Sequence, residues 1–326
     1  MKAVIFDGYT INPGDLSWDK IDRLCERLTV FDATPMDKAL MRLGDSEILF
    51  TSKCPITREF MEKAPNLKFI GCTATGYNNI DVAAAADLGI AVTNVPAYST
   101  DAVAQHTISL ILELANNVGL HNESVQSGQW HESKYFCYWK SPITLLAGKS
   151  LGIIGYGAIG KRVAEIAKAL GMTVNIYRED PMGTMKSDFV SLHCPLTAEN
   201  EKMVNTQFLV NMKPGAFLIN TARGGLVDER ALADALNEGV IAGAGIDTYS
   251  IEPMKADNPL LSLKDPYKLI ASPHNAWAAT EAIDKLVGCI ADNINHWFIE
   301  EGLNGSVIAN SAEAAKQVGD SHTTLT

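Results

Sequence analysis

The chain has 326 residues, of which 47% are hydrophobic and 20% charged, a composition typical of a globular protein with a large core. At roughly 100–200 residues per domain, this length predicts two domains. Lys and Arg total 27 against 38 Asp and Glu, so the formal net charge is −11. A surface this acidic repels polyanions, so we expect neither a nucleic acid nor a membrane as partner.

The beginning of the chain and its cysteines bear on the cellular compartment. The first residues form a short β-like run that ends at Asp7 and Gly8, without the long apolar core of a signal peptide. The six cysteines show neither a C-x-x-C pair nor the Cys/His spacing of a zinc site. We therefore expect a cytoplasmic protein that binds no metal ion and whose cysteines are small buried hydrophobes.

Strand-like and helix-like patterns alternate along the first hundred residues. Helical spacing extends from Trp18 to Leu28 and again from Ala83 to Leu88. Runs of β-branched and aromatic residues predict strands at 4–6, 48–51, 69–73 and 91–94. This alternation indicates a parallel sheet with helices packed on it.

The alternation restarts after an expected long helix at 102–115 and an aromatic segment at 130–139. Six further strands are expected at 151–154, 173–177, 189–192, 216–220, 244–246 and 268–271. Six strands with interleaved helices fit a doubly wound dinucleotide-binding fold. The last stretch, Ser306 to Thr326, is rich in Ala, Ser and Thr and is expected to be a partly ordered tail.

A glycine-rich turn, Gly155-Tyr156-Gly157-Ala158-Ile159-Gly160, follows one of these strands and opens an expected helix. Glycines let the backbone approach a pyrophosphate, and the first N–H groups of the helix attract its negative charge. A glycine pattern alone is weak evidence. The order of strand, turn and helix makes this one a predicted dinucleotide site.

The residues that decide between NAD(H) and NADP(H) are expected at the end of the next strand. Arg178 stands there, followed by Glu179 and Asp180. The guanidinium suits a 2′-phosphate, whereas the two carboxylates repel a phosphate and suit a ribose hydroxyl. A solvated Arg178 fits the sequence equally well, so the choice of cofactor stays open.

The connection that follows, residues 179–186, is short for a crossover between parallel strands. Pro181 and Gly183 disfavour a helix within it. Unless part of the connection is missing, the sequence therefore predicts an unusually open adenine pocket.

Three titratable residues, Arg223, Glu252 and His274, follow three consecutive expected strands. Ligands of open α/β sheets bind outside the carboxyl ends of the strands, so these side chains are expected on one rim. Arg223 can hold a planar carboxylate through two hydrogen bonds. A carboxylate beside a histidine stabilises the imidazolium and makes it a proton donor. Each residue alone is more often structural or solvated, but the three together predict an active site.

Over about 300 residues the chain resembles the D-isomer-specific 2-hydroxyacid dehydrogenases. The matching stretches are 75–81, 102–107, 155–160, 191–197, 220–224, 245–253 and 272–277. Within the family, His274-Asn275-Ala276-Trp277 and Gly76-Tyr77-Asn78-Asn79 look most like the glycerate dehydrogenase, or hydroxypyruvate reductase, branch.

The resemblance implies an α/β architecture of two doubly wound parallel-sheet domains, a flavodoxin-like substrate domain and a Rossmann cofactor domain. The substrate domain is expected at 1–98 and the cofactor domain at 99–298, with 299–326 returning to the substrate domain before the tail. Residues 120–149 resemble the family's dimer arm, which implies a homodimer. Packing of this aromatic segment within one chain is the alternative.

The resemblance also implies roles for single residues. Arg223 grips the 2-oxo acid, His274 protonates its carbonyl oxygen and Glu252 orients His274, while a hydride passes from the nicotinamide to C2. The residues expected to bind the cofactor are Gly155, Gly157, Ala158, Ile159, Gly160, Arg178, Cys194, Pro195, Thr221, Ala222, Asp247 and Ala276. Those expected to bind the substrate are Ala74, Thr75, Gly76, Tyr77 and Trp277.

The expected activity is the NAD(H)- or NADP(H)-dependent reduction of a small 2-oxo acid, hydroxypyruvate or glyoxylate, to D-glycerate or glycolate. A D-lactate dehydrogenase-like enzyme is one alternative, because substrate size depends on the surroundings of Tyr77, Tyr98 and Trp277. A non-catalytic, dinucleotide-sensing protein similar to a corepressor is another. The complete set of Arg223, Glu252 and His274 argues against such a sensor, and the short connection at 179–186 slightly favours it.

Overall fold

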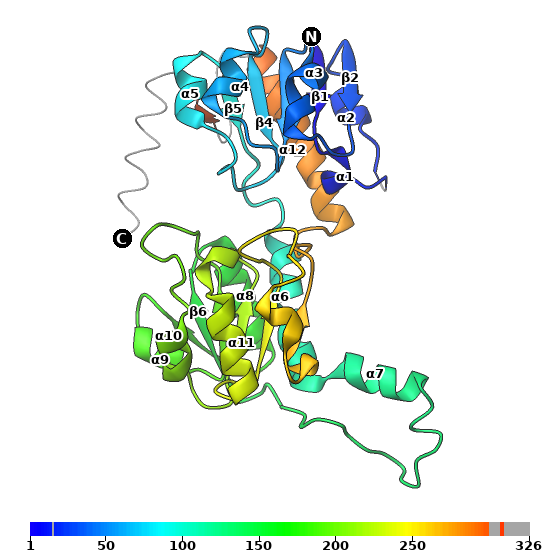
Figure 1. The fold of residues 1–326 in the computed structure, drawn as a ribbon, viewed down its shortest axis with the longest axis vertical. Coiled ribbons are helices and arrows are strands. Elements are labelled where there is room, and N and C mark those ends of the chain that lie inside the picture. Colours follow the sequence, from blue (N-terminus) through cyan, green and yellow to red (C-terminus); the bar gives the residue numbers. More distant parts are fainter. Residues whose placement is uncertain (15, 300–306, 310–326) are drawn as a thin grey trace. The chain divides into compact units, whose positions relative to one another are not determined.

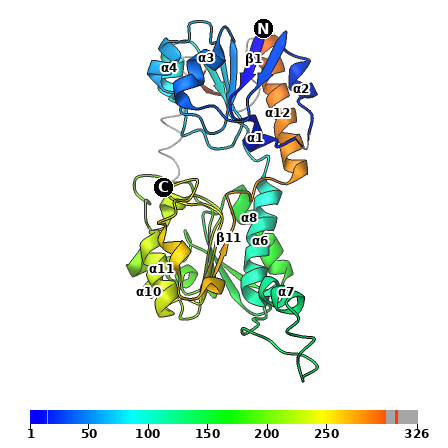
Figure 2. The same cartoon turned by 45° about the vertical axis from the view of Figure 1, so that its right-hand side comes forward.

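A computed structural model describes residues 1–14, 16–299 and 307–309, and their side chains except at 298, 299 and 307–309. The chain forms two compact units (Figures 1 and 2). Unit 1 contains Met1–Ser99 and the described residues from Ala278 onward, and unit 2 contains Thr100–Trp277. None of the described helices has the length and apolar character needed to cross a membrane. The expected tail lies outside the described residues, apart from 307–309.

Unit 1 is built on a six-stranded sheet in the order β12-β5-β4-β3-β1-β2. Its strands are β1 (Lys2–Ile5), β2 (Arg27–Val30), β3 (Ile48–Thr51), β4 (Phe69–Cys72), β5 (Ala91–Thr93) and β12 (Val307–Ala309). The first five are parallel, and β12 pairs with β5 in the antiparallel direction. The order 2-1-3-4-5 of the parallel strands is flavodoxin-like, as expected.

Short helices connect the strands of unit 1. They are α1 (Gly8–Ile11), α2 (Asp19–Asp22), α3 (Ala39–Leu43), α4 (Arg58–Glu62), α5 (Val82–Asp87) and a 3-10 turn at Met36–Lys38. The long helix α12 (Thr280–Ile299) belongs to the same unit. All residues of β3, β4 and β5 are buried, which explains why these strands read as continuous apolar runs.

The prediction of a helix from Trp18 to Leu28 is wrong for most of these residues. The helical part is one turn, α2, and the chain then enters β2 at Arg27. Leu28 fits a helical spacing, but in the structure it pairs with Ala3 of β1. As the edge strand, β2 keeps Arg27 and Val30 exposed, so it lacks the apolar run that reveals a buried strand.

Unit 2 is built on a parallel sheet in the order β11-β10-β9-β8-β6-β7. Its strands are β6 (Ser150–Ile154), β7 (Thr173–Ile176), β8 (Phe189–Leu192), β9 (Phe217–Asn220), β10 (Gly243–Ile246) and β11 (Leu269–Ala271). These confirm the six expected strands to within one residue at each end. The chain runs from β6 to β7 on one side and then returns to β8 on the other, so the switch in strand order lies between β6 and β8.

Helices cover both faces of this sheet. They are α6 (Thr100–Asn116), α8 (Ala158–Ala169), α9 (Pro181–Met185), α10 (Thr206–Asn211) and α11 (Glu229–Glu238), with 3-10 turns at Gly224–Leu226, Pro259–Ser262 and Pro266–Lys268. A further helix, α7 (Val118–Gln126), follows α6 and extends away from the sheet (Figure 1). Ile153 and Ile219 pack in one apolar cluster with α6 and α8. Ile154 and Leu218, the neighbouring strand residues, pack in a second cluster with α10 and α11. Successive strand residues therefore supply two cores, as in a doubly wound fold.

The division between the units differs from the expected boundary at 298/299. The return to unit 1 begins at Ala278, because α12 packs there. In α12, the Asn293 amide donates to Asn94 O at 3.2 Å, and the ring of Trp297 lies 5.0 Å from that of Phe69. The apolar stripe of an amphipathic helix predicts burial, but not which of two sheets it covers.

The expectation of no helix in residues 179–186 is wrong, because α9 forms there. Asp180 caps it by accepting the Gly183 N–H at 2.9 Å, and Pro181 occupies the first turn, where its missing N–H costs nothing. The crossover from β7 to β8 is residues 177–188, about the dozen that a parallel connection needs. A Cβ at Gly152 of β6 would lie 2.3 Å from the Thr184 carbonyl oxygen, so α9 packs directly on the sheet.

We expect Gly152→Ala to destabilise the protein by about 1–3 kcal/mol, because the added methyl forces α9 away from β6. Urea denaturation measures the loss. Gly288→Ala is the control, since nothing lies within 4 Å of that position in α12 and alanine favours a helix by about 1 kcal/mol. Equal stability of Gly152→Ala and the native protein would contradict the close packing of α9.

The cysteines depart in part from the expectation that they are buried. All six are free thiols, and Cys54 and Cys72 are buried, but Cys137 is exposed. Burial raises the pKa of the Cys72 thiol to about 12, so it is inert as a nucleophile.

Candidate active site

The glycine turn after β6 is shaped by contacts that only glycine permits. Gly155 has φ +99°, and a Cβ there would lie 2.4 Å from the Cys194 backbone nitrogen. A Cβ at Gly160 would lie 2.2 Å from the Gly155 carbonyl oxygen. Both residues hold the turn close to its neighbours, as the sequence predicts for a dinucleotide loop.

Open space lies at the middle glycine of this turn. Gly157 is the N-cap of α8 and offers no side chain to the first N–H groups of that helix, and nothing lies within 4 Å of its missing Cβ. Ala158, Ile159 and Gly160 form the first turn of α8. The loop therefore fits the pyrophosphate of NAD(H) or NADP(H), which needs free N–H groups at a helix N-terminus and close access to the backbone.

The ends of β8 and β9 follow along the same edge of the sheet. The His193 N–H donates to Ile154 O at 2.7 Å, which brings Cys194 and Pro195 next to the glycine turn. After β9, the Asn220 side chain shapes its own loop, accepting the Ala222 N–H and donating to Arg223 O. Thr221 is buried at the start of that loop. The cofactor roles of Cys194, Pro195, Thr221 and Ala222 stay predictions.

Arg178 lies in the turn that follows β7 and is exposed. Within the part of the chain that the structure describes, its guanidinium has no ion pair. Asp180 caps α9 through Oδ1, and Glu179 and Asp180 are both exposed next to Arg178. Both carboxylates therefore remain beside Arg178 at this strand end.

Arg223 follows β9 in a loop that presses against the loop after β10. A Cβ at Gly224 would lie 1.8 Å from the Tyr249 carbonyl carbon, so the glycine is required for this contact. Arg223 Nη1 donates to Ala222 O at 2.8 Å, and the side chain is partly exposed. The other N–H groups of the guanidinium remain for a carboxylate ligand.

Glu252 and His274 form a close pair in unit 2. His274 Nδ1 lies 2.6 Å from Glu252 Oε2, and Glu252 Oε1 accepts the Tyr249 N–H at 2.9 Å. Because the carboxylate accepts at Nδ1, the other ring nitrogen, Nε2, is left to exchange a proton with a substrate. The two side chains are 27% and 30% exposed, so solvent protons can reach the pair.

His274 has a backbone φ of +55°, which is unusual for a residue with a side chain. This conformation costs about 1–2 kcal/mol and requires support from its surroundings. Asp247, 1% exposed at the end of β10, accepts the N–H groups of Asn275 and Ala276 at 3.0 Å each. The Trp277 indole N–H donates to His274 O at 2.9 Å. Ala276 and Trp277 thus belong to the loop that carries His274, and Asp247 holds this loop from the end of β10.

The substrate residues expected in unit 1 lie in the loop after β4. Ala74 O accepts the Val95 N–H, and Thr75 Oγ1 donates to Val95 O at 3.0 Å. Gly76 O accepts the Cys72 thiol, and Tyr77 packs against the core of the unit. The loop is well braced within unit 1. Its role in binding substrate stays a prediction.

Sequence reasoning missed two residues beside Asp247. Ser272 Oγ donates to Asp247 Oδ1 at 2.6 Å, and His106 Nε2 of α6 lies 2.8 Å from Ser272 Oγ. His106 stands inside an expected helix and Ser272 directly follows a strand, so neither position signals chemistry by itself. Among the described residues, no group of three or more His, Cys, Asp or Glu side chains lies close enough to hold a metal ion.

Comparison with known proteins decides the family. Residues 108–276 match the model of the D-isomer specific 2-hydroxyacid dehydrogenase, NAD binding domain. The chain belongs to this family. It is an NAD(P)-dependent dehydrogenase that acts on the CH–OH group of D-2-hydroxy acids, which confirms the expected family, α/β fold and cofactor class.

Individual relatives point to one branch. A hydroxypyruvate reductase of Blautia hydrogenotrophica is 41% identical and covers 94% of this chain and 98% of its own length. A glycerate dehydrogenase of Methylorubrum extorquens is also 41% identical, covering 79% and 84%. An NADPH-dependent glyoxylate/hydroxypyruvate reductase of Sinorhizobium meliloti, solved with NADP and malonate, superimposes with a TM-score of 0.79 at 26% identity over 95% and 97% of the two chains.

His193 gives the site region a pH dependence. Part of its surface is exposed, but burial around the ring lowers its pKa from 6.5 to about 4, and its Nε2 lies 2.9 Å from Ser191 Oγ. The folded state therefore keeps His193 neutral at pH values where the unfolded state binds a proton. Stability from this residue is complete above about pH 6.5 and is lost as the pH falls towards 4.

We expect the free energy of unfolding to fall by up to about 1.4 kcal/mol per pH unit across this window on account of His193. Urea denaturation at several pH values from 7 to 4 measures the slope. In His193→Gln the change of the unfolding free energy with pH should be smaller, by at most the contribution of one bound proton. An unchanged slope in that variant would show that His193 does not control it.

Proposed function

We propose that the protein reduces hydroxypyruvate or glyoxylate to D-glycerate or glycolate with NADH or NADPH. The observation that carries the proposal is the 2.6 Å pair of His274 and Glu252, located in the same unit as Arg223 and the glycine turn. The names of the hydroxypyruvate reductase and glycerate dehydrogenase relatives support this choice of substrate.

The proposed reaction adds two electrons and two hydrogens to the 2-oxo acid. The bound reduced nicotinamide supplies a hydride to C2 of the substrate. His274 Nε2 gives its proton to the carbonyl oxygen, which becomes the hydroxyl group. Glu252 stabilises the imidazolium before this transfer and holds the ring through Nδ1. Solvent returns the proton to His274 afterwards, since the ring is partly exposed.

Arg223 is proposed to hold the substrate during this transfer. Its guanidinium can bind the carboxylate and the 2-oxo oxygen through charge-assisted hydrogen bonds, which fix C2 for the hydride. Gly224 sets the position of Arg223 against the loop that leads to Glu252. Asp247 Oδ2 accepts one described hydrogen bond, which leaves room for a cofactor amide as a further donor.

We expect His274→Ala to lower turnover at least about a hundredfold, because general acid catalysis typically contributes 10²–10⁴ in rate. The assay crosses NADH and NADPH with hydroxypyruvate, glyoxylate and pyruvate, and cofactor fluorescence measures binding. Cofactor affinity of the variant should match that of the native protein, since His274 makes none of the contacts of the glycine turn.

Each result of this assay has a definite meaning. A near-native rate of His274→Ala would remove the residue from the mechanism. Preference of the native protein for pyruvate would favour a D-lactate dehydrogenase. Binding of NADH without turnover on any of the three acids would favour a dinucleotide sensor. The ratio of rates with NADPH and NADH tests whether Arg178 binds a 2′-phosphate.

We also propose that the protein is a homodimer through an arm formed by α7 and residues 127–145. Figure 1 shows this arm extending away from the sheet of unit 2. It exposes several large apolar side chains, with exposed fractions of 92% for Phe136, 74% for Leu145, 69% for Trp139 and 50% for Trp130. So many exposed apolar groups on one segment are typical of an interface, and a second copy fits the resemblance to the family's dimer arm.

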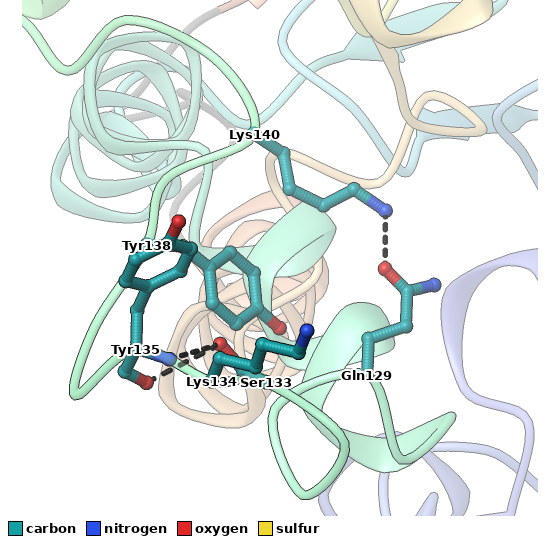
Figure 3. Close-up of a pocket in the computed structure, with 6 residues that line it drawn as sticks. All are labelled: Gln129, Ser133, Lys134, Tyr135, Tyr138 and Lys140. Atoms are coloured by element: carbon teal, nitrogen blue, oxygen red, sulfur yellow. Dashed lines mark hydrogen bonds between the residues drawn. The ribbon is translucent and has the colours of Figure 1, made fainter.

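The arm has internal contacts that give it a defined shape. Ser124 Oγ lies 2.6 Å from the Tyr138 hydroxyl, and Lys140 Nζ donates to Gln129 at 2.8 Å. Figure 3 shows Tyr135 and Tyr138 together with this Lys140–Gln129 bond. These residues line a pocket of about 330 Å³. Pre-ordering of an interface lowers the entropy lost on association, which supports a stable dimer.

We expect the double change Phe136→Asp and Trp139→Asp to convert the dimer into a monomer of 35.2 kDa, because it places charges in the apolar interface. Light scattering coupled to gel filtration measures the mass. Met41→Asp is the control, since Met41 is 72% exposed and lies in unit 1. A native protein that runs as a monomer would overturn the proposed assembly.

A cytoplasmic location is proposed as well. Its support is the six free thiols, one of them exposed, which suit a reducing compartment.

A further inference from the structure

The loop that carries His274 depends on one buried carboxylate. His274 has φ +55°, and the two residues after it donate their N–H groups to Asp247. The other described hydrogen bonds of His274 are the Trp277 indole bond to its carbonyl oxygen and the contact of its ring with Glu252. Glu252 holds the His274 ring, and Asp247 holds the backbone that follows it, so the position of His274 depends on both carboxylates.

Asp247 is in turn held by a chain of hydrogen bonds from another element. Ser272 Oγ lies 2.6 Å from Asp247 Oδ1 and 2.8 Å from His106 Nε2. A carboxylate can only accept, so Ser272 uses its single hydroxyl proton on Asp247. The oxygen of Ser272 must then accept from His106, which places a proton on Nε2 of that ring.

The chain therefore has a direction, from His106 through Ser272 to Asp247. It ends at Asp247, which also accepts the backbone N–H groups of Asn275 and Ala276. His106 Nε2 is also 3.7 Å from Asp247 Oδ1, close enough for a direct favourable interaction when the ring is charged. A buried carboxylate is stabilised by each donor that faces it, so loss of His106 weakens the set that holds Asp247 in place.

The position of His106 on α6 is well anchored. The next residue, Thr107, is fully buried, and its hydroxyl lies 2.9 Å from that of Thr221 at the end of β9. Consecutive residues of α6 thus contact the ends of two strands, β9 through Thr221 and β11 through Ser272. The N-terminal part of α6 is a fixed support under the edge of the sheet that carries Arg223 and His274.

We propose that His106 is a positioning residue for His274 and acts through Ser272 and Asp247. The role in catalysis rests on the proposed function, whereas the hydrogen-bond chain rests on the structure alone. His106 touches neither Glu252 nor His274, and its effect is to keep the His274 loop in its left-handed conformation. The essential property of His106 is the N–H group that faces Ser272.

The experiment compares variants that keep or remove this donor. His106→Leu removes it, His106→Gln supplies an amide N–H in its place, and Ser272→Ala breaks the next link by removal of one oxygen. Ser109→Ala is the matched control, because Ser109 lies on the same helix and its hydroxyl donates to Gln105 O of its own helix. Thermal melting verifies that each variant is folded.

The first measurement is amide hydrogen exchange at Asn275 and Ala276, which does not depend on activity. We expect exchange to accelerate about tenfold or more in His106→Leu and in Ser272→Ala, because opening of the loop becomes easier. His106→Gln and Ser109→Ala should exchange within about threefold of the native protein, because both keep a donor at Ser272.

The second measurement is kinetic. Turnover of hydroxypyruvate should fall about tenfold in His106→Leu and Ser272→Ala, because misplacement of a catalytic group lowers the rate. His106→Gln should recover most of the turnover.

Two outcomes overturn the inference. One is native exchange at Asn275 and Ala276 in both His106→Leu and Ser272→Ala. The other is equal acceleration in His106→Gln and His106→Leu, which would mean that ring packing and not the donor supports the loop. Failure of the native protein to reduce any 2-oxo acid would overturn the proposed function, while the exchange result would still decide the role of His106 in holding the loop.

Discussion

The parallel direction of the strands in unit 2 is the constraint on which the candidate site depends. Because β6, β8, β9, β10 and β11 are hydrogen-bonded neighbours that run the same way, their carboxyl ends lie along one edge. The glycine turn, Arg223, Asp247 and the His274 loop each follow one of these ends. A dinucleotide loop and a proton donor more than a hundred residues apart are thereby presented on one rim. The chemistry of the family needs this arrangement, since hydride and proton must reach adjacent atoms.

Backbone contacts then determine how closely the loops along this edge approach one another. Gly155 lies against the end of β8, and Gly224 lies against Tyr249, at distances that no Cβ could share. Hydrogen bonds to polar side chains then fix the conformation of these loops. The Asn220 side chain accepts a hydrogen bond within the loop before Arg223, and Glu252 orients the His274 ring. Asp247 accepts the backbone N–H of the residue that follows His274. The loops of the site are thus held in place in two ways. Glycines allow close contact between their backbones, and side-chain acceptors form hydrogen bonds within and between the loops.

The sequence predicted the strands of both sheets well, because buried parallel strands are continuous apolar runs. It failed at β2, where an edge strand carries Arg27 and the spacing of Leu28 imitates a helix. It failed at α9, where Asp180 and Pro181 work as a helix start and the composition alone indicates a loop. The pairing of His274 with Glu252 was predicted, since both follow consecutive strands and match the family. His106 and Ser272 were not, because their contact depends on the packing of α6 beneath β11 and no local pattern reports it.

The placement of α12 affects how the chain is synthesised. Unit 1 begins at the N-terminus but takes α12 from residues beyond 277, so its first 99 residues leave the ribosome long before this helix is made. Residues 100–277 form a continuous unit and can fold meanwhile, as domains generally do. Until α12 arrives, the surface that Leu286, Val287, Ile290 and Ile294 bury in the finished protein has no cover. Unit 1 therefore stays incomplete until α12 is made, although most of it is translated before unit 2.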